Sequence, residues 1–475
     1  MIGLVVAASD VTRDVTSAHS IGGAKDLPIP AGLAIAGAVA ALAVSFVVLA
    51  IAWRTPRFEP GTDGRALPWL TALVDSTAFR LGARVVGLLV VGWAVFAAVF
   101  GQDVLNNPFF GMFYVWLWVG LVPASLLLGP VWKAISPARS VHWLVSRATG
   151  GDPGRGLYEY PERLGLWPAA LGLYAFVWLE LVYPYSTELG PVRLWVAVYA
   201  AVMLLGGALF GEVFFERADP FEVYSSMVAR LSVFGRRSAE VTGTAARGGR
   251  PRPPADAGQI VVLSPLSNLS SLPARPGLIA VVSVLFGSTA FDSFRDSTHW
   301  VRFIQDTPVI RDRVWANQLA NNAGLLAFVL LVALVLVVGT ASTGVEAGTR
   351  RRGLPVQFAH SVVPIIVGYV VAHYLSYFVE VGQDTVIKAS DPLTNGSNLL
   401  GTGDLTVSYW LSYHPTFLAN TKVLAVVIGH VLGVVAAHDR AIRLLPARHH
   451  VTGQLPLLVA MVGFTAGGLY LLFSA

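Results

Sequence analysis

Two stretches of this sequence place imidazole and carboxylate groups at helical spacing beside apolar segments. Asp292, Asp296 and His299 are separated by four and then three residues, so they share one face if a single helix continues through them. The second stretch repeats this spacing. Its members are His373, Tyr377 and Glu380. Each stretch is therefore predicted to present acid and imidazole along one stripe of a helix.

His430 lies in a further apolar segment, and a rise of 1.5 Å per residue would place it about 6 Å deeper than His373. Imidazole and carboxylate together suit Zn²⁺, Fe²⁺ or Mn²⁺. Such an ion lowers the pKa of bound water and polarises a phosphoryl or carbonyl oxygen. We predict a divalent-metal site whose ligands or bases are His373, His430, Asp292 and Asp296, supported by Glu380, Tyr377 and His299, with Glu180 able to complete the set.

The same residues allow other interpretations. They could relay protons or bind a substrate, or they could form structural contacts between helices, such as a pair between Arg295 and Asp292. One haem held between His373 and His430 is a lesser alternative. No compact ligand motif of the H-E-x-x-H type occurs, so the metal prediction rests on residues far apart in sequence.

Ten apolar segments carry these residues. About 20 apolar residues are needed to cross the hydrocarbon core of a bilayer, and a lipid-exposed backbone must satisfy its polar groups within the segment. We therefore predict an all-α polytopic membrane bundle of about ten helices. The segments cover residues 30–53, 84–101, 109–130, 166–187, 191–214, 276–293, 323–342, 357–380, 419–437 and 455–474.

Basic residues alternate between successive connections. Most of the 33 Lys and Arg residues lie in the odd-numbered connections, among them Arg54, Lys133, Arg351 and Arg440. Because basic residues collect on the cytoplasmic side, both termini are predicted to face outward. The site residues Asp292 and Asp296 then lie at an outward helix end. We expect a multi-pass protein of the plasma membrane.

Composition excludes several classes of protein. The chain is 55% hydrophobic and 13% charged with a mean hydropathy of +0.63, which is not the composition of a soluble domain. The pI of 9.4 reflects basic flanks that face anionic lipid, so no nucleic-acid partner is expected. The sequence has no cysteine, which excludes disulfides and thiolate ligands. The expected partners are the lipid bilayer and a small molecule or ion.

The longest cytoplasmic connection divides the chain into two halves. We expect an extracytoplasmic segment at 1–29 with a short signal as one option, a five-helix half at 30–214, an Arg/Pro/Gly-rich loop at 215–275, and a second five-helix half at 276–475. Five spans in each half would orient the halves oppositely, as in inverted-repeat transporters. Gly and Pro interrupt the third and eighth segments at matching places, namely Gly120 and Pro123, and Pro364 and Gly368.

Other features carry less chemistry. Glu212, His360, His438 and Asp439 fall at inner ends of segments, where contact with headgroups explains them. The stretch from Phe221 to Val233 is expected to form a helix on the membrane surface, and the long outer loop from Asp384 to His414 could act as a lid.

Several runs carry a resemblance to a known family, namely His19–Gly23, Asp26–Pro30, Ala372–Tyr377, Ser390–Leu393, Gly429–Gly433, Ala437–Ala441 and the final segment Leu455–Leu472. They resemble a family of bacterial membrane proteins that is common in actinobacteria and often labelled fenitrothion hydrolase. The resemblance implies hydrolysis of an organophosphate triester with release of a nitrophenol. It supplies no catalytic residue set.

Three hypotheses follow. The first is a membrane-embedded hydrolase of phosphoric or carboxylic esters, assisted by metal at an outward-facing site. The second is a secondary transporter or metal-handling permease that uses the same residues. The third is a structural subunit of an envelope complex. A hydrolase requires ligands converging on a cavity, whereas a transporter requires a path that continues inward past Glu212 or His360 and related geometry in the two halves.

Overall fold

The computed structural model describes residues 23–58, 64–237, 258–343, 351–446, 449–450 and 452–474. It is 75% helical, which confirms the all-α polytopic fold. His19, the proposed signal segment, most of the expected flexible linker and part of the His19–Gly23 run lie outside the described residues.

Eight helices of the described chain are long and apolar enough to cross a bilayer, and a bent pair makes a ninth span. The fourth predicted segment, 166–187, corresponds to the shorter apolar helix α9 (Trp167–Leu181), which has only 15 residues. The eight are α2 (Ala31–Ala52), α4 (Thr77–Phe100), α10 (Leu189–Phe210), α14 (Leu278–Arg295), α17 (Val314–Ala341), the run Arg351–Lys388, α22 (Pro415–Leu444) and the run Thr452–Phe473, formed by η8 (Thr452–Gln454) and α23 (Leu455–Ser474).

The third and eighth segments are both interrupted helices. The third consists of α5 (Pro108–Phe110), the π-helical η2 (Gly111–Val119) and α6 (Leu121–Leu128), with a bend of 44°. The eighth contains a second π-helical stretch. Its elements are η4 (Arg351–Gly353), α18 (Leu354–Phe358), η5 (Ala359–Val362), α19 (Val363–Ser376), the π-helical η6 (Tyr377–Val381) and α20 (Gly382–Lys388). π-Helical stretches often occur at functional sites, so both segments draw attention to this region.

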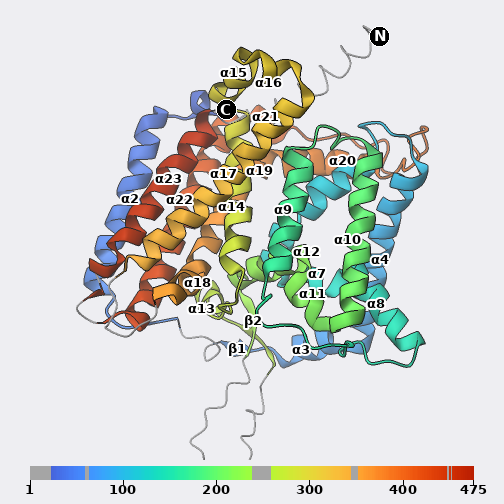
Figure 1. Cartoon of the computed structure of the whole chain (residues 1–475), viewed down its shortest axis with the longest axis horizontal. Helices are drawn as coiled ribbons and strands as arrows, with labels where there is room; N and C mark the ends of the chain where they lie inside the picture. Colours follow the sequence, from blue (N-terminus) through green and yellow to red (C-terminus); the bar gives the residue numbers. More distant parts are fainter. Residues whose placement is uncertain are drawn as a thin grey trace, which may run out of the picture.

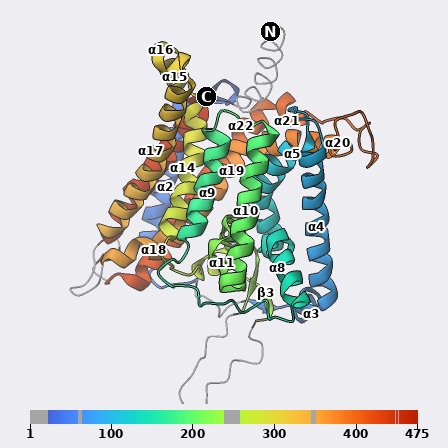
Figure 2. The ribbon, with the colours of Figure 1, turned by 45° about the vertical axis from the view of Figure 1, so that its right-hand side comes forward.

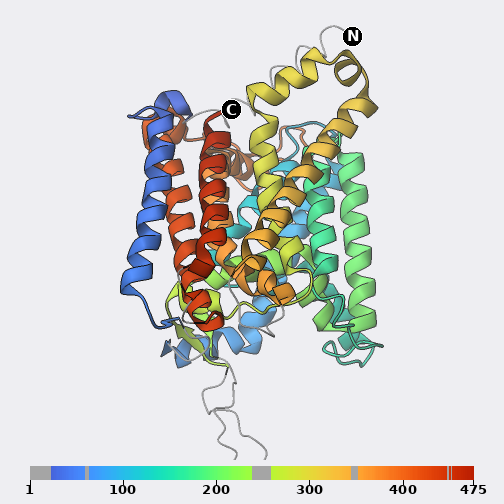
Figure 3. The same ribbon diagram turned by 60° about the vertical axis from the view of Figure 1, so that its left-hand side comes forward.

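Burial separates central helices from peripheral ones. Residues are buried over 78% of the apolar window of α14 and 72% of that of the eighth segment, compared with 17% for α4. The peripheral helices expose apolar side chains instead, for example Leu89 on α4 and Leu194 on α10. Figure 3 shows α2, α22 and α23 side by side, as their contacts require. The exposed apolar surface indicates a lipid bilayer around the bundle.

Short elements cover the two ends of the bundle (Figure 1). One end lies near both chain termini, and we call it the terminal end. It holds η1 (Ala24–Asp26), α15 (Thr298–Asp306), α16 (Pro308–Asp312), α21 (Trp410–Tyr413) and the end of α23. The opposite end carries a small β-sheet, described below, and we call it the sheet end. It holds α3 (Pro68–Asp75), α7 (Val131–Ile135), α8 (Pro137–Ala148), α11 (Glu212–Ala218), η3 (Ala229–Leu231) and α13 (Pro265–Ser270). The connections predicted to be cytoplasmic thus gather at the sheet end.

A small antiparallel sheet, which the sequence analysis did not predict, lies at the sheet end. Its strands are β1 (Arg65–Ala66), β2 (Phe234–Arg236) and β3 (Ile260–Val262). The order is β1-β3-β2, with Arg65 opposite Val262 and Arg236 opposite Ile260. The first connection and the central loop are therefore joined by backbone hydrogen bonds.

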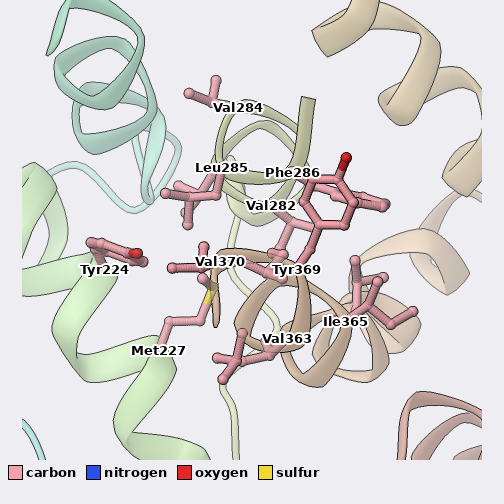
Figure 4. Packing of buried hydrophobic residues seen from close by; sticks show 14 of the residues in the cluster. Tyr224, Met227, Val282, Val284, Leu285, Phe286, Val363, Ile365, Tyr369 and Val370 are labelled. Atoms are coloured by element: carbon pink, nitrogen blue, oxygen red, sulfur yellow. The ribbon is translucent and has the colours of Figure 1, made fainter. Parts of the chain in front are cut away.

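Helix α12 (Pro220–Val228) corrects the expectation of a helix lying on the membrane surface. All but one of its nine residues are buried. Figure 4 shows Tyr224 and Met227 of α12 facing Leu285 of α14 and Val370 of α19. Apolar residues on several faces pack inward, and the one charged side chain, Glu222, is paired with Arg139, so no charged face is left to lie against lipid headgroups.

Candidate functional site

The centre of the site is a hydrogen-bonded pair between the two central helices. Asp292 near the end of α14 places its Oδ2 2.9 Å from Nε2 of His373 on α19. Both side chains are buried. The two residues came from separate predicted stretches, so the structure joins the two stripes at this point. An ionisable pair inside a membrane bundle is costly and is a functional candidate by default.

Three hydroxyl groups extend this pair. None of them was predicted from the sequence as a site residue. Tyr374 donates a hydrogen bond of 2.7 Å to Asp292 Oδ2, and Ser293 Oγ lies 3.1 Å from His373 Nδ1. Tyr369 in turn donates to Ser293 Oγ at 3.0 Å. The result is a continuous chain from Tyr369 through Ser293 and His373 to Asp292. Tyr369 could have been found from its i,i+4 spacing to His373.

Glu180 of α9 adds a second carboxylate. It lies within electrostatic range of Asp292 and of Arg295, whose guanidinium donates to the carbonyl oxygen of Leu181 at 2.5 Å. Tyr377 interacts electrostatically with both Glu180 and Asp292. Figure 2 shows α9 beside α14, which is where these groups meet. The predicted role of Glu180 as a member of the set is therefore consistent with its place.

The expected stripe of Asp292, Asp296 and His299 does not form. Helix α14 ends at Arg295 with Asp296 as its C-cap, and Ser297 caps a new helix, α15, by accepting from the amide of Trp300. Asp296 still interacts electrostatically with Asp292 and His373. His299 instead approaches Tyr470 at 3.2 Å on the exposed terminal end. The Ser297 cap, which favours a helix start, is the physical reason for the break.

The stripe of His373, Tyr377 and Glu380 is also altered. The chain turns π-helical from Tyr377 to Val381, which changes the angle between successive side chains and directs Glu380 away from His373. Glu380 accepts hydrogen bonds from the amide and hydroxyl of Ser412, at 3.1 and 2.7 Å. Glu380 therefore anchors α21 of the outer loop, whereas Tyr377 stays near Glu180 and Asp292.

His430 lies much deeper than predicted. Helices α19 and α22 pack so closely that a Cβ on Gly368 would lie 2.4 Å from the carbonyl oxygen of Ala425, and one on Gly429 2.6 Å from that of Pro364. This antiparallel register places His373 roughly ten residues, or about 15 Å, from His430. His430 Nδ1 bonds to the carbonyl of Val426 at 2.8 Å, while Nε2 has no partner among the described residues.

The predicted metal site is therefore not supported by the geometry. His430 is too far from His373 to share an ion, and the same distance removes the haem alternative. Within the described residues, no three His, Asp or Glu side chains are arranged to hold a metal ion. The donors that do converge, Asp292 and His373, already bind each other.

The ionisable residues at the inner ends have protein partners. His438 contacts Gln454 Oε1 at 3.1 Å and the carbonyl of Trp53 at 3.0 Å, and His360 contacts the carbonyl of Gln357 at 3.0 Å. Asp439 accepts from Arg443 at 2.7 Å. The contacts are structural, as expected, but they are made to protein groups rather than to lipid headgroups.

A second buried polar group lies towards the sheet end and was not anticipated. Arg139 of α8 forms a two-fold hydrogen bond with Glu222 of α12, with Nη2–Oε1 at 2.8 Å and Nε–Oε2 at 3.1 Å. Its Nη1 also lies 3.3 Å from Glu212 Oε2. Asp219, the N-cap of α12, accepts from Trp132 and Tyr199, each at 3.0 Å. Arg139 lies in a loop predicted to be cytoplasmic, and nothing in the sequence indicated that it would be buried or which residues it would contact.

Two cavities of the described chain lie away from Asp292 and His373. One, of about 460 Å³, is lined by residues of α8, the loop after it and α10, including His142, Asp152, Arg155 and Ala208. The other is only large enough for a single water and adjoins Phe46 and Val434. Asp292 and His373 are themselves buried, at 8% and 6% exposure.

Comparison with protein-family models, with curated proteins and with solved structures finds no match. The class of the protein follows from its own architecture. The apolar helices and the buried polar centre define a multi-pass α-helical membrane protein.

Proposed function

We propose that the protein is a proton-coupled secondary transporter of the plasma membrane, with Asp292 and His373 as the proton-binding pair. The observation that carries this proposal is the buried hydrogen bond between these two side chains, extended by Tyr374 and Ser293. Histidine changes charge near neutral pH, and buried Asp–His chains are typical of proton relays in membrane proteins.

The groups around the pair suit proton exchange better than metal-assisted hydrolysis. Glu180, Asp296 and Arg295 supply nearby charges, and Tyr369, Tyr374 and Tyr377 supply hydroxyls. A proton that leaves Asp292 can be replaced through His373, whose second nitrogen faces Ser293. The site needs no ion to complete it.

A second group of buried polar residues lies beside Glu212, at the sheet end. Arg139, Glu222 and Asp219 lie towards the sheet end, and aromatic residues separate them from the outer pair. A hydrolase with an outward site has no need of this second centre.

The interrupted third and eighth segments support an inverted arrangement of two halves. Both contain a π-helical stretch, and the two stretches pack against each other. Trp116 Nε1 of the first also donates to the carbonyl of Gly382, the residue directly after the second, at 3.2 Å. Broken helices at corresponding positions are typical of transport sites at the interface of repeats.

The test is proton uptake and solute-driven current. Purified protein would be titrated without buffer between pH 5 and 8, and proteoliposomes would be challenged with amino acids, organic cations, sugars and metal ions on a solid-supported membrane. We expect currents that require a pH gradient and vanish in Asp292→Asn, with Asp306→Asn as the exposed control. Equal proton uptake in wild type and Asp292→Asn would contradict the proposal.

Ester hydrolysis is a second candidate, favoured by one observation. Ser293, His373 and Asp292 are joined in the order of a nucleophile, base and acid, and the family resemblance implies phosphotriester cleavage. Ser293 is only 1% exposed, so substrate must open the bundle to reach it. A fluorophosphonate probe that labels the wild type but not Ser293→Ala would establish this candidate, and absence of labelling in active protein would reject it.

A further inference from the structure

The buried pair of Arg139 and Glu222 lies where a closed inner barrier is needed. Arg139 is 4% exposed and Glu222 is 1% exposed. Replacing such a pair by apolar residues is often neutral or favourable for stability, so stability alone is a weak explanation for it. A second explanation for the buried pair is that the two charged groups pair in one conformation of the protein and separate in another.

The elements that carry this pair are short and are joined at glycines. Gly129 (φ 86°) follows α6 and precedes α7, and a Cβ there would meet no atom within 4 Å. Gly211 (φ 68°) separates α10 from α11. Glycine adopts positive φ without strain, so these junctions can change direction.

On its outer side, the pair is followed by a packed layer. Ser225 of α12 contacts Ser125 of α6 at 2.8 Å. Beyond them, the ring of Tyr224 lies 5.1 Å from that of Trp118, which lies 4.9 Å from Phe176. This aromatic layer separates Arg139 and Glu222 from the outer Asp292–His373 pair.

On its inner side, the pair is separated from a cavity by one side chain. The cavity of about 460 Å³ is lined by His142, which lies one turn after Arg139 on α8. Phe215 contacts both, with its ring 5.4 Å from that of His142 and 5.3 Å from Cζ of Arg139. Water at the sheet end therefore reaches within one aromatic ring of the ion pair.

We propose that Arg139 and α12 form the inner gate of the transport path, closed by the Arg139–Glu222 pair. This inference rests on the proposed transport function and adds its conformational control. When the pair separates, α12 moves away from α7 and α8. The cavity beside His142 then becomes continuous with the space around Ser225.

Cysteine labelling tests this directly because the natural sequence has no cysteine. Ser225→Cys would be treated with a membrane-impermeant methanethiosulfonate in inside-out vesicles, which expose the sheet end. We expect slow labelling with the ion pair intact and at least tenfold faster labelling with Arg139→Gln/Glu222→Gln. Arg139→Lys, which keeps the charge but loses the two-fold geometry, should give an intermediate rate.

Two controls isolate the gate. Glu162→Gln breaks an exposed ion pair with Arg217 at the same end and should leave the rate at Ser225→Cys unchanged. Thr149→Cys, which is exposed, should label quickly in every background. Thermal unfolding in detergent identifies any variant that fails to fold, and Arg139→Lys then serves as the deciding variant.

The gate and the proton site can fail separately. Unchanged labelling in folded gate variants, together with normal proton uptake, would overturn the gate and retain proton coupling. Faster labelling in protein that takes up no protons at Asp292 would retain the gate and reject proton coupling.

Discussion

Tyr374 and His373 share a single oxygen of Asp292. The phenol donates to Oδ2 at 2.7 Å, and the imidazole Nε2 lies 2.9 Å from the same atom. Two adjacent residues of α19 thus contact one carboxylate on α14. Both hydrogen bonds are therefore affected whenever the charge of Asp292 changes.

Tyr374→Phe removes one of these contacts and keeps the ring. A hydrogen bond to a charged group contributes about 1.5–3 kcal/mol, so we expect transport to fall about tenfold. Asp292→Asn should abolish it, because the amide cannot exchange a proton at this position. Solute-driven currents in proteoliposomes measure both effects. Tyr413→Phe, at an exposed tyrosine of the terminal end, is the matched control.

Gly429→Ala should destabilise the bundle. The added Cβ would lie 2.6 Å from the carbonyl oxygen of Pro364, so α19 and α22 must move apart. Overpacking of this kind costs about 1–3 kcal/mol. Thermal unfolding in detergent measures the change. Gly467→Ala, where a Cβ meets no atom within 4 Å, should leave the unfolding temperature unchanged or higher, and equal losses at both sites would contradict the packing argument.

Arg139→Met leaves Glu222 buried without its partner. Breaking a buried pair by removing one member costs about 3–5 kcal/mol. We expect Arg139→Met/Glu222→Met to unfold at a higher temperature than Arg139→Met alone, because the double change leaves no unpaired charge. A double-mutant cycle on thermal unfolding measures the coupling. Strict additivity of the two single changes would show that the pair does not interact.

The ion pair between Asp75 and Arg236 should make stability depend on pH. The hydrogen bond from Arg236 and its charge hold the pKa of Asp75 below its ordinary value. A lowered folded-state pKa means that the stabilisation is present above the unfolded pKa of about 4 and is lost as the pH falls through the folded value. Both side chains are nearly half exposed, so solvent limits the contribution to about 1 kcal/mol.

The measurement compares unfolding temperatures of wild type and Asp75→Asn between pH 3 and 7. The difference in unfolding temperature between the two proteins should be present at pH 6 and should disappear as the pH approaches 3. Asp306→Asn, at an exposed residue of α15, should show no such pH-dependent difference.

The membrane segments could be predicted from the sequence because hydropathy acts over whole segments. An earlier start, by seven residues at α4 and nine at α17, leaves the prediction of a spanning helix the same. The pairing of Asp292 with His373 was implicit in the prediction that both lie at outward helix ends. What brought them together, however, was the packing of α14 against α19, which single-segment patterns do not encode.

The remaining differences arise from local geometry and helix register. A serine cap ended α14 before His299, and a π-helical turn moved Glu380 to Ser412. The depth of His430 was set by the contact between Gly368 and Gly429, which fixes how far α22 slides along α19. Residue spacing along one helix cannot report the register between two helices.

The order of the small sheet has a consequence for how the chain could be divided. Strand β3 belongs to the later part of the central loop, yet it lies between β1 and β2, which both precede residue 238. Strand β3 is thus held on each side by a strand from the chain before residue 238. A protein expressed as two separate polypeptides, cut between residues 237 and 258, should therefore reassemble and purify as one unit.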